Sequence, residues 1–148
     1  MHGSMSVCLL AMPLLGVPFV AAGQDIANAA IGKWKTFDDQ TGKAMSITEV
    51  YRTKTGAICA RIVETLNKPN ATCVACPGDK KGKPVAGMVV FWGMRRQENG
   101  LWGGNGFKPS TGTSFKVKRV RLLENGRKLE ITGCKVIFCR TAIWERVN

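Results

Sequence analysis

Cysteines are the residues of this 148-residue chain whose types and spacing could most directly do chemistry. Two pairs lie close in sequence: Cys73 with Cys76, and Cys134 with Cys139. In an oxidising compartment the simplest prediction is one local disulfide in each pair, with Cys59 left as a free thiol in a strand. Disulfides that join Cys73 or Cys76 to a strand cysteine also fit, because four cysteines allow three connectivities.

The same cysteines are compatible with two other kinds of site. A Cys-x-x-Cys pair is redox-active when a helix N-terminus stabilises its thiolate. Here Pro77 and Gly78 follow the pair, and no helical pattern does. Two cysteine pairs could also bind zinc, as they do in zinc ribbons. We favour structural disulfides over both, and we expect no metal ion and no cofactor.

The N-terminal region is nearly all apolar over residues 5–23 and contains no Lys or Arg there. The small residues Ala21, Ala22 and Gly23 close this stretch, so we predict a secretory signal peptide over residues 1–23. A single membrane anchor is the alternative, but two prolines and a length that barely spans a bilayer argue against it. We therefore predict one mature domain of residues 24–148, periplasmic or secreted, and favour a monomer.

Removal of the signal would also remove His2, which is the one histidine of the chain. Serine–histidine and cysteine–histidine nucleophile pairs, histidine bases and histidine metal ligands would then all be excluded. No other catalytic motif is visible, so we do not expect an enzyme.

The charges are unbalanced, since 22 Lys and Arg against 10 Asp and Glu give a net charge of +12. An exported chain with this charge favours envelope polyanions, such as lipopolysaccharide, as partners. The run Lys80, Lys81 and Lys83 is the candidate anion contact, and a simply hydrated loop is the alternative. Because the chain has one Tyr and six Phe, stacking on bases is poorly supported and we expect no nucleic acid.

Alternating side chains and glycine turns predict an all-β fold. We expect one helical turn at residues 25–30 and Asn-Gly hairpins at Asn99 and Asn125, with positive φ at both central turn residues. A change of alternation near Lys118 and Arg119 predicts a β-bulge. We expect eight strands of an antiparallel up-and-down barrel, at 31–37, 45–52, 57–66, 87–94, 101–107, 115–122, 128–132 and 136–147.

A long segment at residues 67–86 interrupts this rhythm with three prolines and two cysteines. The apolar strand that follows would be buried on both faces, or covered on its outer face by that segment. An eight-stranded barrel can hold one small apolar or amphipathic ligand. We expect six residues to line its interior or mouth: Ile62, Met88, Val90, Trp92, Trp102 and Phe115.

Seven short motifs occur in order: Gly32-x-Trp34, Asp38-Asp39-x-Thr41-Gly42-Lys43, Cys73-x-x-Cys76, Pro84-x-x-Gly87-Met88, Trp102-x-Gly104, Pro109-x-x-Gly112 and Trp144-x-Arg146. Together they resemble a family of small exported bacterial proteins, the domain-of-unknown-function family twenty-one forty-seven. The resemblance covers about residues 31–147. It implies a lipocalin-like barrel in the bacterial envelope, and it implies no activity.

The chain ends are also similar to those of lipocalins, in which a Gly-x-Trp packs beneath a basic residue of the last strand. Carried over by position, Gly32 and Trp34 would close one end of the barrel beside Trp144. Trp34 would stack with Arg146, or with Arg140 if the register differs. Such a cation–π contact contributes about 0.5–2 kcal/mol and is structural, not catalytic.

Two positions depart from the family pattern near one rim of the barrel. The residue before Pro109 is often acidic, and position 115 is often Tyr, whereas this chain has Lys108 and Phe115. If a ligand contacts that rim, this chain has lost a carboxylate and a hydroxyl at these two positions. The first hypothesis remains a small-ligand-binding module, and the second is an envelope interaction or inhibitor protein that uses the basic surface and the 67–86 segment.

Overall fold

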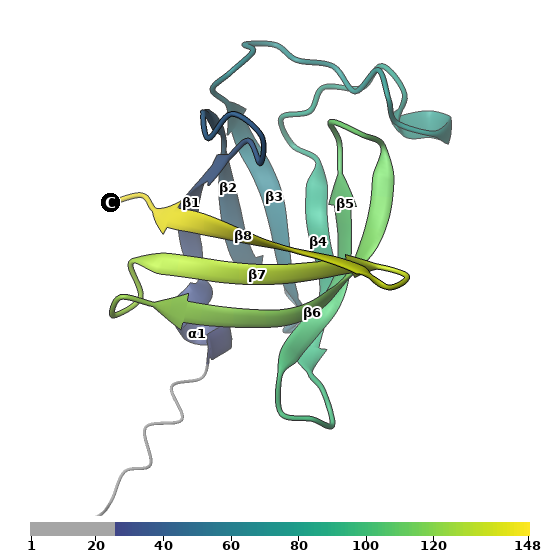
Figure 1. Cartoon of the computed structure of the whole chain (residues 1–148). Coiled ribbons are helices and arrows are strands. Elements are labelled where there is room, and N and C mark those ends of the chain that lie inside the picture. The colour runs from purple at the N-terminus through teal and green to yellow at the C-terminus, as the bar shows by residue number, and fades with distance from the viewer. Residues whose placement is uncertain (1–25) are drawn as a thin grey trace, which may run out of the picture.

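Neighbouring strands of the sequence are neighbours in space throughout this fold, and β1 closes a barrel by pairing with β8 (Figure 1). The computed structural model describes residues 26–148, so the predicted signal peptide and His2 lie outside the described residues. The elements are α1 (Ile26–Ala30), β1 (Gly32–Phe37), β2 (Ala44–Arg52), β3 (Ile58–Thr65), the 3-10 turn η1 (Gly78–Lys80), β4 (Val89–Arg96), β5 (Trp102–Lys108), β6 (Thr113–Leu123), β7 (Lys128–Lys135) and β8 (Phe138–Arg146). The predicted eight-stranded antiparallel barrel is confirmed.

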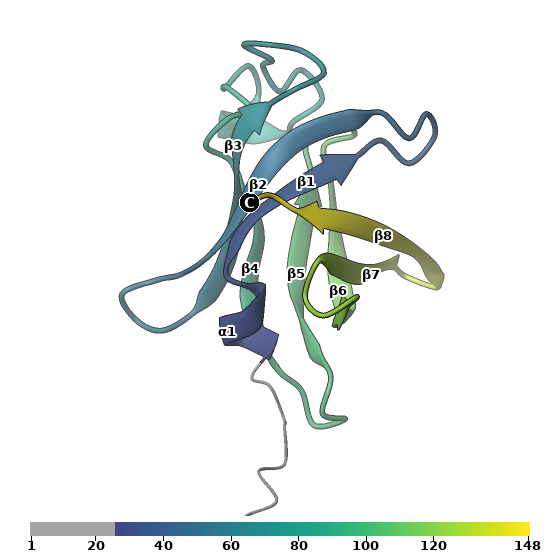
Figure 2. The same cartoon turned by 90° about the vertical axis from the view of Figure 1, so that its left-hand side faces the viewer.

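The ends of the barrel are built differently (Figure 2). Helix α1 packs at the end where β1 begins, and the 67–86 segment extends beyond the opposite end. No helix within residues 26–148 is long and apolar enough to cross a membrane.

The register contains the predicted bulge in β6. Val117 pairs with Gly133 and Arg119 pairs with Thr132, so Lys118 has no residue directly opposite it. The extra residue resets the alternation, and Val117 and Val120 are therefore both buried in the core.

Several expected strand boundaries are wrong by two or three residues. Strand β4 spans Val89–Arg96 instead of 87–94, and β6 begins at Thr113 instead of residue 115. Strand β7 ends at Lys135 instead of residue 132, and β8 begins at Phe138 instead of residue 136. Val136 and Ile137 form a two-residue turn between β7 and β8, although both are good strand formers. Lys135 pairs with Phe138, so the register of the hairpin overrides the local preference.

The two Asn-Gly turns also differ. In the β6–β7 turn Glu124, Asn125 and Gly126 all have positive φ, of 51°, 55° and 83°. In the β4–β5 turn Gly100 has a φ of 79°, but Asn99 is not in the left-handed region, contrary to the expectation. In that turn the Gln97 N–H donates to Leu101 O and closes a three-residue loop, which needs positive φ only at its glycine.

Candidate functional site

Trp34 closes the α1 end of the barrel. Its side chain is fully buried, and its indole Nε1–H donates to the carbonyl oxygen of Ala30, 2.9 Å away at the end of α1. The guanidinium carbon of Arg146 lies 4.2 Å from the centroid of the indole ring. Arg146, and not Arg140, is therefore the stacking partner, because β1 pairs with β8 through Trp34 and Arg146.

Arg146 also joins three segments of backbone at this end. Its guanidinium donates to the carbonyl oxygens of Gly126 at 2.7 Å and Ile31 at 3.2 Å, and to that of Ala29. Gly32 has a φ of 134°, and a Cβ atom there would lie 3.0 Å from Nη1 of Arg146. The Gly-x-Trp motif and the last-strand arginine thus form one structural unit, in which the arginine is not available to a ligand.

The barrel interior is mostly filled by side chains. Phe91 stacks on Trp144 with ring centroids 5.2 Å apart, and Phe115 meets Phe91 edge to face at 6.1 Å. Beside α1 there remains an apolar cavity of about 40 Å³, lined by residues that include Ile58, Met94 and Trp102. Ligand pockets usually measure ~300–1,000 Å³, so this cavity holds no more than a few waters unless the barrel opens.

The six residues expected to line the interior or mouth fall into two groups. Ile62, Val90, Trp102 and Phe115 belong to the barrel core or pack against it. Met88 and Trp92 pack instead against a second apolar cluster formed by Cys73, Cys76 and Phe107.

Met88 and Trp92 do not face the interior, which is one of the two places expected for them, the interior or the mouth of the barrel. Ala60 pairs with Phe91 and Arg61 pairs with Val89, which leaves Val90 as an extra residue. Phe91 therefore faces the core, and the side chain of Trp92 lies on the outer face of β4. Met88 precedes β4 and packs with the segment at residues 67–86.

A ladder of hydroxyl groups inside the barrel went unnoticed in the sequence. Thr36 Oγ1 and Ser46 Oγ are 2.7 Å apart, and Ser46 Oγ lies 3.3 Å from Thr48 Oγ1. Ser46 and Thr48 are buried, and Thr48 pairs with Trp34 across β1 and β2. Alternation in β2 could have revealed this ladder only together with the register that turns these positions inward.

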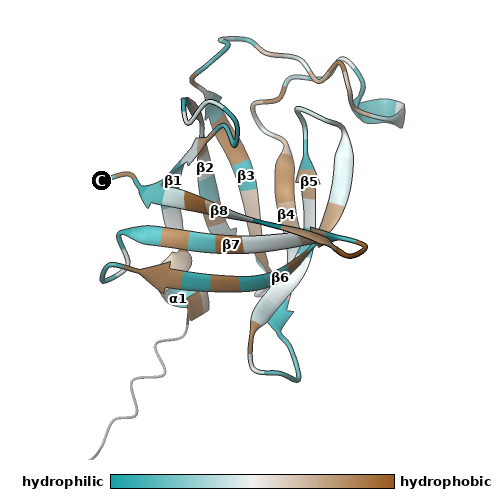
Figure 3. Ribbon diagram, viewed as in Figure 1, coloured by the Kyte–Doolittle hydropathy of each residue, from teal (hydrophilic) through white to brown (hydrophobic). Residues whose placement is uncertain are grey.

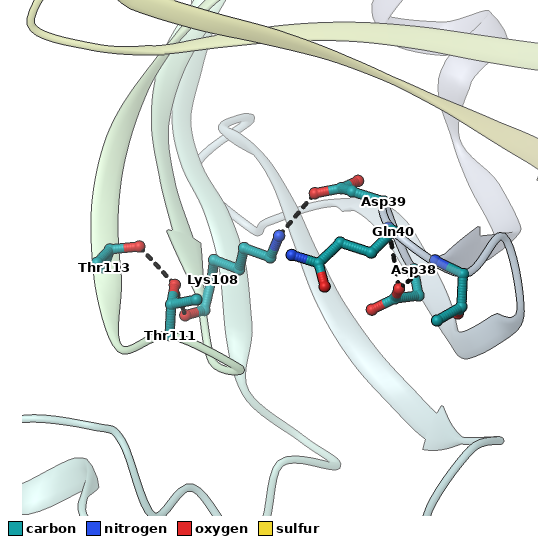
Figure 4. Close-up of polar contacts among 7 residues, drawn as sticks. Asp38, Asp39, Gln40, Lys108, Thr111 and Thr113 are labelled. Carbon is teal, nitrogen blue, oxygen red and sulfur yellow. Dashed lines mark hydrogen bonds and ion pairs between the residues drawn. The ribbon is translucent and has the colours of Figure 1, made fainter.

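The rim opposite α1 is crossed by an ion pair (Figure 4). Lys108 at the end of β5 reaches Asp39 in the β1–β2 turn, with Nζ and Oδ2 2.6 Å apart. In the same turn Asp38 accepts hydrogen bonds from the backbone N–H of Thr41 at 2.7 Å and of Gln40 at 3.0 Å. The Thr41 amide, assisted by the Thr41 hydroxyl and the Gln40 amide, lowers the pKa of Asp38 below its ordinary value.

The segment at residues 67–86 is folded against the outside of the barrel. A disulfide joins Cys73 to Cys76, and both half-cystines are buried against Phe107. The ammonium of Lys80 lies 4.5 Å from the ring centroid of Phe107 and 5.8 Å from that of Trp92. Lys80 is therefore engaged with aromatic rings, although it is exposed, as Lys81 and Lys83 are.

The remaining cysteines follow the simplest prediction. Cys134 and Cys139 form the second disulfide, with a Cα–Cα distance of 4.0 Å, and Cys59 is a free thiol. No group of three or more His, Cys, Asp or Glu residues within 26–148 could hold a metal ion.

An open groove of about 790 Å³ lies over the ends of β3 to β6 nearest α1. Its cationic lining residues come from two strands: Arg95, Arg96, Lys116 and Lys118. No Asp or Glu lines it, and none of the ion pairs found among residues 26–148 involves these four cations.

The floor of this groove is apolar and thin. Ile58, Met94 and Trp102 line both the groove and the 40 Å³ cavity inside the barrel, so they form the wall between the two. Gly103 is required at this place, because a Cβ atom there would lie 2.5 Å from the carbonyl oxygen of Val117. Sequence reasoning missed this groove, because its residues are brought together only by the pairing of four strands.

A closed eight-stranded barrel, plugged at one end by a tryptophan and a last-strand arginine, defines a lipocalin-like protein. The solved structure of protein HP1028 from Helicobacter pylori, described as belonging to the lipocalin family, has the same fold. The TM-score is 0.67 with 19% sequence identity, over 80% of this chain and 83% of that chain. A comparison with curated proteins found no match.

The family follows from a second comparison. Residues 32–146 match the model of DUF2147, described as an uncharacterised protein conserved in bacteria, and the chain belongs to that family.

Proposed function

We propose that this protein is an exported binding module for an anionic amphiphile, a small molecule with an acidic head and an apolar part. Closed eight-stranded barrels of this kind can hold one small ligand. The two disulfides are compatible with an oxidising compartment such as the bacterial envelope. In this proposal the chain binds its ligand without transforming it.

The observation that carries the proposal is the composition of the 790 Å³ groove, in which cations without acidic partners lie beside an apolar floor. Several basic side chains elsewhere in the described chain do have acidic partners. For example, Arg61 binds Glu49 at 2.8 Å, and Arg121 binds Glu130 at 2.6 Å. In the groove, a ligand carboxylate or phosphate would supply the missing partner for Arg95 and its neighbours.

The apolar part of the ligand would lie on Met94 and Trp102. Methionine side chains adapt readily to different shapes, so a movement of Met94 would connect the groove to the interior cavity. The acidic head of the ligand would then lie at the surface, and its apolar part would extend into the barrel. Such a ligand does not need a large preformed cavity inside the barrel.

Binding of dodecanoate to the purified protein, measured by calorimetry and by Trp fluorescence, tests this proposal. We expect dodecanol, which has the same chain without the charge, to bind at least about tenfold more weakly, since a hydrogen bond to a charged group contributes ~1.5–3 kcal/mol. The double variant Arg95→Ala, Arg96→Ala should remove this preference. Equal binding of both ligands, or unchanged dodecanoate binding by the variant, contradicts the proposal.

Lys81→Ala is the matched control, because Lys81 is also an exposed cation but lies in the 67–86 segment. It should leave dodecanoate binding unchanged. The alternative function, an envelope interaction through that segment, predicts the reverse pattern. Lys81→Ala should then lose binding to acidic partners, and the double variant Arg95→Ala, Arg96→Ala should retain it.

A further inference from the structure

We infer that the tip of the β7–β8 hairpin inserts into the surface of an anionic lipid bilayer. Three consecutive apolar residues form this tip, namely Val136, Ile137 and Phe138. Their side chains are 90%, 81% and 77% exposed. The hydropathy colouring shows the tip as an apolar end on a hairpin that extends beyond the adjacent strands (Figure 3).

Neither burial nor backbone geometry accounts for valine at position 136. Val136 has a φ of 58°, in the left-handed region that β-branched residues rarely adopt. Glycine or asparagine is the residue that such a two-residue turn favours. An apolar side chain at this point is therefore unfavourable for the isolated fold, and it gains only by contact with something outside the chain.

The strand pairing and the disulfide of the β7–β8 hairpin hold the tip in place. Cys134 pairs with Cys139 and is bonded to it, two residues before Val136. The pairing of β7 with β8 continues without a shift to Lys128 and Glu145. Ordering the tip at a surface thus costs little conformational entropy, because most of the hairpin is already fixed.

Charge identifies the surface as anionic. Lys135 and Arg140 stand on either side of the tip, and both are exposed. Residues 131–144 contain no Asp or Glu. Lys116 of β6, which pairs with Cys134, adds a third exposed cation. The nearby carboxylate of Glu130 is bonded to Arg119 and Arg121, so it does not offset these charges.

The shape favours a bilayer over a protein partner. Specific protein interfaces bury roughly 800 Å² on each partner, which is far more than a tip of three side chains presents. A second copy of this chain would place Lys135 and Arg140 against the same cations of its partner. A lipid surface needs only a few apolar side chains at the depth of the headgroups and basic residues beside them.

The experiment measures co-sedimentation with vesicles, using the chain as cells produce it and with its N-terminus established by mass. Vesicles of phosphatidylglycerol and phosphatidylcholine are compared with vesicles of phosphatidylcholine alone. We expect binding to the anionic vesicles, weakened about fivefold by Lys135→Ala and again by Arg140→Ala. Failure of the native chain to bind anionic vesicles overturns the inference.

The triple variant Val136→Gly, Ile137→Ser, Phe138→Ser separates binding from folding. It should bind anionic vesicles at least about tenfold more weakly, because its apolar contact with lipid is lost. Its melting temperature should rise or stay unchanged, since glycine relieves the left-handed backbone at position 136. Undiminished vesicle binding by this variant overturns the inference.

Val74→Ser is the matched control, since Val74 is as exposed as Phe138, at 77%, but lies in the 67–86 segment. It should bind vesicles like the native chain, and an equal loss in Val74→Ser and the triple variant contradicts a specific tip. Sedimentation velocity tests whether the tip binds a second copy of this chain instead. The inference is also contradicted if the native chain forms a dimer that the triple variant does not form, and the native chain does not bind vesicles.

Discussion

The two ends of β8 contain the same kinds of residue and use them in opposite ways. At one end Trp144 is buried and Arg146 lies over the indole of Trp34. At the other end Phe138 is exposed, and Arg140 has no ring beneath it among residues 26–148. The arginine of the first end lies against groups within the fold, and the arginine of the second is exposed to solvent.

The difference shows that neighbouring segments, and not residue type, decide what an arginine does here. Near Arg146 the chain places α1, Ile31 just before β1, and the β6–β7 turn, each with a carbonyl oxygen that accepts a hydrogen bond. Beside Arg140 there is only Gly133 of β7 in register. A guanidinium with several fixed acceptors stabilises the fold, and one without them remains available for contacts outside the chain.

Trp34→Ala removes the most buried side chain of the closed end and should have the largest effect. Removal of a fully buried tryptophan leaves a cavity, and the free energy of unfolding should fall by about 3–5 kcal/mol. Urea denaturation followed by circular dichroism measures this loss. Trp34→Phe keeps a ring but loses the hydrogen bond to Ala30, so it retains more stability than the alanine variant. A loss below about 1 kcal/mol in Trp34→Ala contradicts the assignment of this end as the anchor of the fold.

Arg146→Ala compared with Arg140→Ala tests the two ends directly. The first removes the stacking contact and charged hydrogen bonds, and should cost about 2–3 kcal/mol in the free energy of unfolding. The second should leave unfolding unchanged. Arg146→Lys keeps the charge without the planar fork, and it should lie between alanine and the native chain. Equal costs for the two alanine variants mean that the ends of β8 do not differ.

The strands could be predicted from the sequence because alternation with period two is a local signal. The bulge at Lys118 is visible for the same reason, since a change of alternation within β6 is a local pattern. The contact of Trp34 with a last-strand arginine is implied by the resemblance to lipocalins, and that resemblance leaves Arg146 and Arg140 both open.

The features that could not be predicted from the sequence depend on the register between distant segments. Val136 and Ile137 have strong strand preference, and only the pairing of Lys135 with Phe138 turns them into a loop. The outward position of Trp92 follows from the extra residue Val90, whose effect appears only once β3 is in place. The basic groove requires four strands at once, so no motif identifies it.

The double variant Cys134→Ser, Cys139→Ser tests how much the exposed end of β8 contributes to stability. A disulfide that closes so short a loop contributes about 2 kcal/mol or less by the chain-entropy estimate, and the hairpin around it remains paired. We therefore expect a smaller loss in urea unfolding than for Arg146→Ala. A loss larger than that of Arg146→Ala means that the exposed hairpin, and not the closed end, limits stability.

Asp38 in the β1–β2 turn should give the smallest effect, and one that depends on pH. Because the folded pKa of Asp38 is lowered, its carboxylate stabilises the fold above the unfolded value of about 3.9, and this contribution is lost as pH falls through the folded pKa. The melting temperature of Asp38→Ala should lie slightly below that of the native chain near pH 6, and the gap should narrow below pH ~3. Asp38→Asn keeps an acceptor oxygen without the charge, so it separates the hydrogen bonds to Gln40 and Thr41 from the titration. An NMR titration midpoint for Asp38 at or above the ordinary aspartate value contradicts the turn geometry, because two backbone amides directed at a carboxylate must favour its charged form.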